Sequence, residues 1–328
     1  RWSRFWESVG EDVYLATKMG VATIEGYQGN DISAKNKVAA CMKHFLGYSG
    51  PKSGKDRTPA WIPERQLQEY FVPSFQAAID AGAKTIMINS GEVNGIPVHC
   101  NPKILKDLLR DQMGFKGLAV TDWEYIGYLR DRHRVAVDYK DAIRLAINAG
   151  IDMAMVPMDT RFPVLLKELV EEGKVPMSRI DEAVERILTL KFELDLFENP
   201  YFPFEDYIEF NSGNSIETAY QAALESQTLL KNDNNTLPIS KAKRVLVTGL
   251  TSNSRIALNG GWSRTWQGTN EEHHLDTQPT ILEAIQAKIG ADNVFYEDEK
   301  ELIKVKSTAT AADIAVVCLG EMPYCEKP

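Results

Sequence analysis

The sequence predicts an α/β protein in which helices cover parallel strands, in two successive regions. Three observations support this. Short apolar runs alternate with amphipathic stretches of helical period, the pattern of strand–helix–strand repeats. The runs are continuously apolar, which indicates that both faces of each strand are buried. The connections between segments are short. In the first region a β/α barrel and an open doubly wound sheet both fit.

The first region contains four predicted strands and five predicted helices. The strands are the apolar runs 38–41, 85–88, 118–120 and 153–156. The helices are 64–80, 103–112, 140–148, 163–171 and 177–196, and the last ends before Asn199-Pro200, a typical stop signal. These four or five β/α units are too few to close an eight-stranded barrel, so we expect further units before Arg1.

A second α/β domain follows a predicted linker, 200–214, which contains prolines and several aromatic residues. Helices are predicted at 215–231 and 278–288, and strands at 244–250, 294–296 and 314–319. The chain of 328 residues begins with Arg1 and stops at Pro328, directly after an acidic and aromatic motif. We therefore expect a fragment that lacks both ends.

Composition and missing motifs exclude several classes of function. Lys and Arg number 37 against 46 Asp and Glu, a net charge of −9 that argues against nucleic-acid binding. No apolar run approaches the roughly 18 residues of a membrane span. The four cysteines form no CxxC pair, and no spacing of Cys, His and carboxylates indicates a metal ion. GxGxxG, HExxH and GxSxG are absent, so we expect no cofactor.

Polar side chains follow each predicted strand of the first region. The pairs are Lys43-His44, Asn89-Ser90, Asp122-Trp123 and Pro157-Met158. Barrel enzymes present their catalytic groups at the carboxyl ends of strands, which favours a barrel, although open sheets also bind ligands there.

Asp122 follows its strand directly and precedes Trp123. An N-cap or a salt-bridged loop carboxylate is the usual role of an Asp in such a place. The pair also suits a sugar, since an indole stacks on an apolar ring face while a carboxylate attacks or stabilises the anomeric carbon. By position alone, both interpretations stay open.

Four cationic residues of the first region could bind a sugar. Lys43 lies between a buried strand and Phe45, where a lysine is hard to solvate, so we expect it to bond sugar hydroxyls or to hold a carboxylate ionised. Arg4 and Arg57 are permanently charged donors that could do the same, or could be surface cations. His44 fits a substrate contact and a structural histidine equally well.

The second region contains further candidate functional residues, which are tryptophans and glutamates. Trp262 and Trp266 stand between glycines, which predicts a loop that projects an indole toward a ligand or partner. Glu321 and Glu326 follow an apolar strand and are either solvated loop residues or include a proton donor.

Taken together, these residues resemble glycoside hydrolase family 3, in its β-glucosidase and exo-β-glucanase branch, over nearly the whole chain. The segments that carry the resemblance are 1–12 (PRWGRxxES…ED in the family), 43–45 (KHF), 94–101 (NGxPxHxN), 114–123 (GFxGxVxSDW), 179–188 and 229–232. The resemblance implies the later part of a (β/α)8 TIM-like barrel over 1–198, a linker over 199–214 and the early part of an α/β sandwich domain over 215–328.

The family implies a retaining mechanism. Asp122 would be the nucleophile and Glu326 the acid/base, with Glu321 as runner-up, and retention needs the two carboxyls about 5 Å apart. Sugar hydroxyls would bind Arg4, Lys43, His44 and Arg57. Trp123 and Trp266 are similar in position to the indole pair that clamps the next sugar in exo-glucanases of the family.

Two departures from the family pattern concern specificity and subfamily. The tyrosine that many members carry before NG is absent from 89–93, and we expect Glu92 to fill its space. The loop 50–59 contains Asp56 without a following His, which argues against the N-acetylglucosaminidase branch. The family's aspartate for the distal hydroxyls would precede Arg1, so any activity would be that of the parent enzyme.

The expected function is therefore an exo-acting β-glycosidase that releases terminal glucose from β-glucosides or gluco-oligosaccharides. A β-xylosidase or another family 3 glycosidase is the first alternative, and an inactive carbohydrate-binding fragment is the second. Periplasmic or secreted location is preferred, since polymer-degrading relatives are often exported. Whether the protein forms a homodimer is left open.

Overall fold

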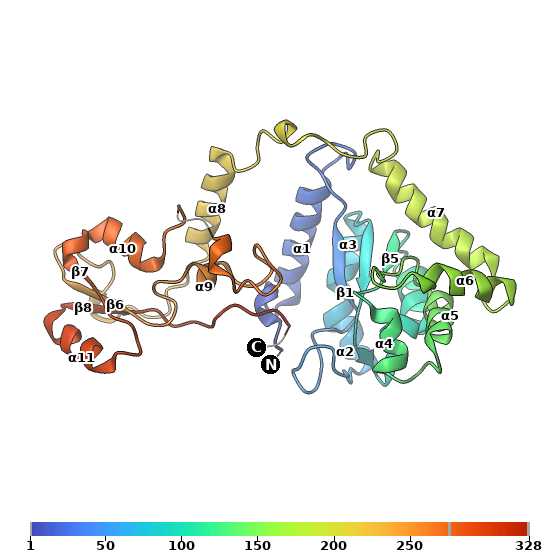
Figure 1. Ribbon diagram of the computed structural model, residues 1–328, viewed down its shortest axis with the longest axis horizontal. Helices are drawn as coiled ribbons and strands as arrows, with labels where there is room; N and C mark the ends of the chain where they lie inside the picture. The colour runs from blue at the N-terminus through green and yellow to red at the C-terminus, as the bar shows by residue number, and fades with distance from the viewer. Residues whose placement is uncertain (1, 275–276, 327–328) are drawn as a thin grey trace. The chain divides into compact units, whose positions relative to one another are not determined.

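The computed structural model describes residues 2–274 and 277–326. The chain divides into two compact units, Arg1–Ile208 and Glu209–Pro328, and each is described by itself (Figure 1). Both units are α/β, which confirms the predicted class. The predicted domain bounds stay a prediction. Arg1 in the first motif and the last two residues of the second predicted domain lie outside the described residues.

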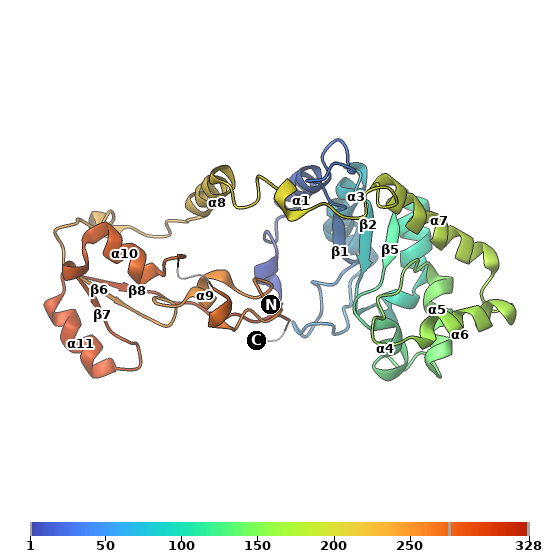
Figure 2. The ribbon, with the colours of Figure 1, turned by 45° about the horizontal axis from the view of Figure 1, so that its top comes forward.

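A three-stranded parallel sheet forms the centre of the first unit. Its strands are β1 (Cys41–Phe45), β2 (Thr85–Ile88) and β5 (Leu118–Val120), in the order β1-β2-β5 (Figure 2). The bounds of β2 and β5 are those predicted, since each is a short apolar run buried on both faces. A two-stranded antiparallel ladder, β3 (Glu92–Val93) with β4 (Ile96–Pro97), follows β2.

Two predicted strands of the first unit differ from the structure. β1 begins at Cys41 instead of Val38, because the Val38 N–H bonds to Tyr27 O at the end of α1 and does not join the sheet. Lys43 and His44 therefore lie inside the strand. The run 153–156 makes only an isolated parallel bridge from Met153 to Val120, since its carbonyls accept from the irregular segment that follows β5.

Helices cover the sheet of the first unit. They are α1 (Val13–Gln28), α2 (Glu64–Gln66), α3 (Val72–Asp80), α4 (Tyr125–Asp131), α5 (Tyr139–Ala149), α6 (Arg161–Glu171) and α7 (Met177–Glu193), with π-type turns at Leu67–Phe71 and Lys103–Gln112. The pattern did not predict α1 or α4. Helix α1 packs on α3, and α5 packs on α4 and α6 (Figure 1). The core contains the fully buried side chains of Phe45, Ile86, Ile88, Leu105, Leu109, Ile126 and Ile143.

A buried charge cluster joins α7 to the sheet. The Asp152 carboxylate is fully buried and accepts from Arg110 at 2.8 Å, Arg179 at 2.6 Å and Arg186 at 2.8 Å. It also accepts the N–H of Ala119, in β5, at 2.9 Å. Because Arg179 and Arg186 both belong to α7, one carboxylate ties this helix to the strand that leads to Asp122.

The second unit has its own parallel sheet. Its strands are β6 (Val245–Thr248), β7 (Val294–Tyr296) and β8 (Ile314–Val317), in the order β7-β6-β8. Its helices are α8 (Gly213–Glu225), α9 (Arg255–Asn259), α10 (Ile281–Ile289) and α11 (Leu302–Ala311). Thr280 and Glu283 form a capping box at the start of α10. Among the described residues, no helix is long and apolar enough to cross a membrane.

Candidate active site

Asp122 lies two residues beyond the carboxyl end of β5 and is only 8% exposed. Its Oδ1 accepts the Trp123 N–H at 2.7 Å, and its Oδ2 accepts the hydroxyl of Ser90, which follows β2. Its own N–H donates to Nε2 of the fully buried His99 at 3.3 Å. Both the carboxylate and its backbone are therefore held in place.

Two further groups face the same oxygen of Asp122. Arg57 Nη2 lies 3.5 Å from Oδ2, and His44 Nε2 lies 3.7 Å from it. Burial lowers the pKa of His44 to about 3. The positive charges of Lys43, Arg4 and Arg57 also lower this pKa, whereas the negative charge of Asp122 raises it. His44 is thus neutral at physiological pH.

The carboxyl of Asp122 is held ionised. Its burial alone would raise its pKa. The hydrogen bond from Ser90, the neighbouring His44 and Arg57 and the Trp123 N–H together outweigh this, so the pKa lies below its usual range. An ionised carboxylate in a largely buried place is suited to act as a nucleophile.

Arg4 is connected to Arg57, and so to Asp122, through Tyr48 and Asp56. Its guanidinium is buried, bonds Glu7 in bidentate form at 2.7 Å and donates to Tyr48 Oη at 3.0 Å. The Tyr48 hydroxyl donates to Asp56, whose other oxygen lies 3.6 Å from Arg57 Nη1. Tyr48 also packs on the His44 ring, with centroids 4.2 Å apart.

Lys43, Trp123 and Glu92 are placed differently. The Lys43 side chain is exposed, whereas its neighbours Met42 and His44 in β1 are buried. The expectation that Lys43 is hard to solvate is thus wrong. Trp123 is 56% exposed beside Asp122, as a sugar platform would be. Glu92 Oε1 lies 2.6 Å from Nδ1 of His133, so its carboxylate is already engaged.

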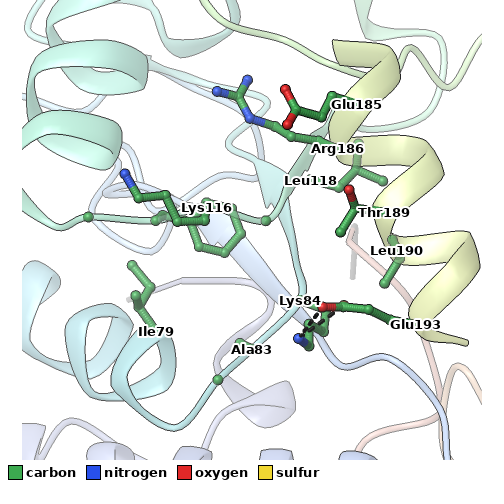
Figure 3. Close-up of a pocket in the computed structure, with 14 residues that line it drawn as sticks. Ile79, Ala83, Lys84, Lys116, Leu118, Glu185, Arg186, Thr189, Leu190 and Glu193 are labelled. Carbon is green, nitrogen blue, oxygen red and sulfur yellow. Dashed lines mark hydrogen bonds and ion pairs between the residues drawn. The ribbon is translucent and has the colours of Figure 1, made fainter. Parts of the chain in front are cut away.

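Two cavities flank the sheet of the first unit. One, of about 520 Å³, is lined by Arg4, Lys43, His44 and Tyr48 together with residues of α1. The other, of about 510 Å³, lies at the amino ends of β2 and β5, away from Asp122. There Glu193 of α7 pairs with Lys84 at 3.0 Å (Figure 3). None of the candidate site residues lines this second cavity.

The second unit carries the other candidates. Glu326 is 7% exposed and has a left-handed backbone, with φ of 67°. Glu321 is exposed. Trp266 is 54% exposed on the loop that follows α9. Within the described residues, no group of three or more His, Cys, Asp or Glu could hold a metal ion.

Sequence reasoning missed several members of this site. Ser90, Tyr48 and His99 contact the candidate residues directly, yet none was proposed as a functional residue. Ser90 follows β2 and His99 lies in the 94–101 motif, so position offered a signal for both. Position offered no signal for Tyr48, which lies in none of the family motifs, and its bond to Arg4 spans 44 residues of the chain.

Two family models match the chain. The glycosyl hydrolase family 3 N terminal domain matches residues 1–190, and the C-terminal domain of that family matches residues 227–327. Among solved structures, a β-glucosidase from Listeria innocua in complex with glucose has a TM-score of 0.87 and 32% identity, and the match covers 98% of this chain and 44% of that one.

Three curated relatives are similar in sequence. A lysosomal beta glucosidase of Dictyostelium discoideum is 45% identical over 100% of this chain and 42% of its own length. A periplasmic beta-glucosidase of Salmonella typhimurium is 33% identical over 88% of this chain and 37% of its own. A beta-xylosidase of Formosa agariphila is 38% identical over 76% and 36%. The chain thus spans about two fifths of the length of these relatives.

Proposed function

The chain belongs to glycosyl hydrolase family 3, and from this premise we propose that its protein is a retaining, exo-acting β-glucosidase. One observation carries the proposal. Asp122 is a buried carboxylate kept ionised by Ser90 and Arg57 at the end of β5, beside the exposed indole of Trp123. Two relatives named as β-glucosidases are similar in sequence to this chain, with 45% identity over 100% of it and 33% identity over 88% of it.

The proposed reaction has two steps. Asp122 attacks the anomeric carbon of the terminal glucose while the bond from that carbon to the leaving oxygen breaks, and Glu326 gives its proton to that oxygen. Water then attacks the same carbon and passes a proton to Glu326, which frees Asp122 and releases glucose with its original configuration. Glu321 is the second choice for the acid/base.

The remaining site residues bind the sugar in this proposal. Arg4, Lys43, His44 and Arg57 donate hydrogen bonds to its hydroxyls, Trp123 and Trp266 stack on sugar faces, and Glu92 takes the space of the tyrosine that many family members carry. The neutral His44 suits this role, because it can donate or accept toward a hydroxyl.

We also propose that the sheet β1-β2-β5 is part of a (β/α)8 barrel and that the second unit is part of an α/β sandwich. The parallel order of the strands and the position of Asp122 at their carboxyl ends support the barrel.

Replacement of Asp122 tests the proposal. In the full-length protein, Asp122→Asn should lower kcat on an aryl β-glucoside on the order of 10⁴-fold, the scale seen when an essential catalytic group is removed. The control Asp131→Asn changes an exposed ion pair with Arg130 and should leave turnover unchanged. A 2-deoxy-2-fluoro-β-glucoside should label Asp122, which mass spectrometry can locate. Undiminished turnover in Asp122→Asn, or a label elsewhere, would overturn the assignment.

A β-xylosidase is the second candidate, supported by the missing tyrosine and by the relative of that name. Paired assays on aryl β-glucoside and aryl β-xyloside decide between the two, because a pentose pocket should reject the extra hydroxymethyl group. An inactive carbohydrate-binding protein would bind glucose and release sugar from neither substrate.

We propose a periplasmic or secreted location, with β-linked glucosides as partners. Relatives named as periplasmic and lysosomal support a location outside the cytosol. A homodimer is the oligomeric state to test first, by light scattering of the purified protein.

A further inference from the structure

The segment that carries Glu326 is fastened to the loop that carries Trp266. The side-chain oxygen of Gln267 accepts the Cys325 N–H at 3.0 Å. The Cys325 thiol donates to Trp266 O at 2.6 Å, and that carbonyl also accepts the Trp262 N–H at 3.0 Å. Two consecutive residues of this loop, Trp266 and Gln267, thus bond the residue directly before Glu326.

The two segments approach each other so closely that the loop needs glycine. A Cβ on Gly261 would lie 2.7 Å from Tyr324 O and 2.5 Å from the Cys325 sulfur. A Cβ on Gly268 would lie 2.1 Å from Gly260 O. Contacts this short cannot be made by a larger residue, so Gly261 allows the two segments to approach each other and Gly268 allows the loop to fold back on Gly260.

Glu326 directly follows the residue that is fastened in this way. It is 7% exposed with φ of 67°, a backbone region in which few residues other than glycine are stable. Cys325 is 1% exposed, and its N–H has Gln267 as its partner. Because a buried N–H without an acceptor is costly, loss of Gln267 should let the backbone at 325 rotate and carry Glu326 with it.

We propose that Gln267 is a positioning residue for the acid/base Glu326, and that it holds the Trp266 platform and the acid as one unit. This inference rests on the proposed function. It assigns to Gln267 no contact with substrate, and it predicts that losing the Gln267 side chain weakens proton donation rather than sugar binding.

The dependence of rate on leaving group tests this role. A poor leaving group such as an alkyl alcohol needs the proton of the acid, whereas dinitrophenolate leaves without it. In the full-length protein, Gln267→Ala should lower kcat/KM for an alkyl β-glucoside about tenfold or more and for the dinitrophenyl β-glucoside less than about threefold. Gln221→Ala is the matched control, since Gln221 is exposed and its side-chain amide donates to Glu217 at 2.6 Å.

The conservative variant Gln267→Glu separates positioning from folding. It keeps an acceptor for the Cys325 N–H, so the ratio of the two rates should return to within about threefold of the wild-type ratio. Its added negative charge should raise the pKa of the acid, and the alkaline limb of kcat/KM should move to higher pH. A uniform loss on both substrates in Gln267→Ala, or an unmoved alkaline limb in Gln267→Glu, would overturn the inference.

The variant Glu326→Gln distinguishes a failure of this inference from a failure of the proposed function. If Glu326 is the acid/base, Glu326→Gln shows a much larger loss on the alkyl than on the dinitrophenyl substrate. Equal losses there refute the acid/base assignment itself, and the inference with it. A selective loss in Glu326→Gln without one in Gln267→Ala refutes only the role of Gln267.

Discussion

Substitution of Asp152 by Asn should destabilise the first unit strongly. The Asp152 carboxylate is fully buried and accepts from three guanidinium groups, so the variant leaves three positive charges facing a neutral amide. Burial already lowers the pKa of Arg110 to about 10, with the two other arginines of the cluster acting in the same direction. Removing one partner of a buried ion pair costs about 3–5 kcal/mol.

The expected loss in free energy of unfolding follows from how exposed each arginine is, rather than from the number of hydrogen bonds to Asp152. Arg179 is 5% exposed, whereas Arg110 is 13% and Arg186 23% exposed, so water can compensate the latter two in part. We therefore keep to about 3–5 kcal/mol, instead of adding the values of four separate charged hydrogen bonds. For a unit of this size, this corresponds to a melting temperature lower by about 6–20 °C.

Two measurements check this prediction. Urea unfolding followed by circular dichroism gives the change in stability, and hydrogen exchange shows where it occurs. Amides of α7 and β5 should exchange faster, because Asp152 joins these two elements. The control Asp131→Asn removes an exposed partner of Arg130 and should change little. An Asp152→Asn protein within about 1 kcal/mol of wild type would refute the reasoning.

Two further predictions concern single contacts. Ser90→Ala removes a hydrogen bond that lowers the pKa of Asp122. Activity requires the ionised carboxyl and is lost as pH falls through that pKa, so the acidic limb of kcat/KM should move to higher pH; an unmoved limb contradicts this. Gly117→Ala places a Cβ 2.1 Å from Lys84 O and should destabilise by about 1–3 kcal/mol in urea unfolding. Gly20→Ala, in α1 with open space around it, should stabilise by about 0.5–1 kcal/mol; equal effects of the two glycine variants would refute the close-contact argument.

The strands β2 and β5 were predictable from sequence because each is a short apolar run buried on both faces. The start of β1 was not. Val38 is as apolar as its neighbours, yet its N–H bonds to the end of α1, a contact that no local pattern encodes. The expectation that Lys43 is hard to solvate was also wrong, since its side chain is exposed although Met42 and His44 on either side of it are buried.

By itself, the sequence determined the α/β class, the family motifs and the place of Asp122 just after an apolar strand. These follow from periodicity and from short runs of residues, which local hydrogen bonding and burial produce. Only the tertiary structure decided which groups surround the carboxylate. Ser90 lies 32 residues from Asp122 in the chain and Arg57 lies 65 residues away. Ser90 and Asp122 meet because the parallel strands β2 and β5 bring their carboxyl ends to one edge of the sheet, and Arg57 reaches the same carboxylate from the loop 50–59. That juxtaposition keeps Asp122 ionised.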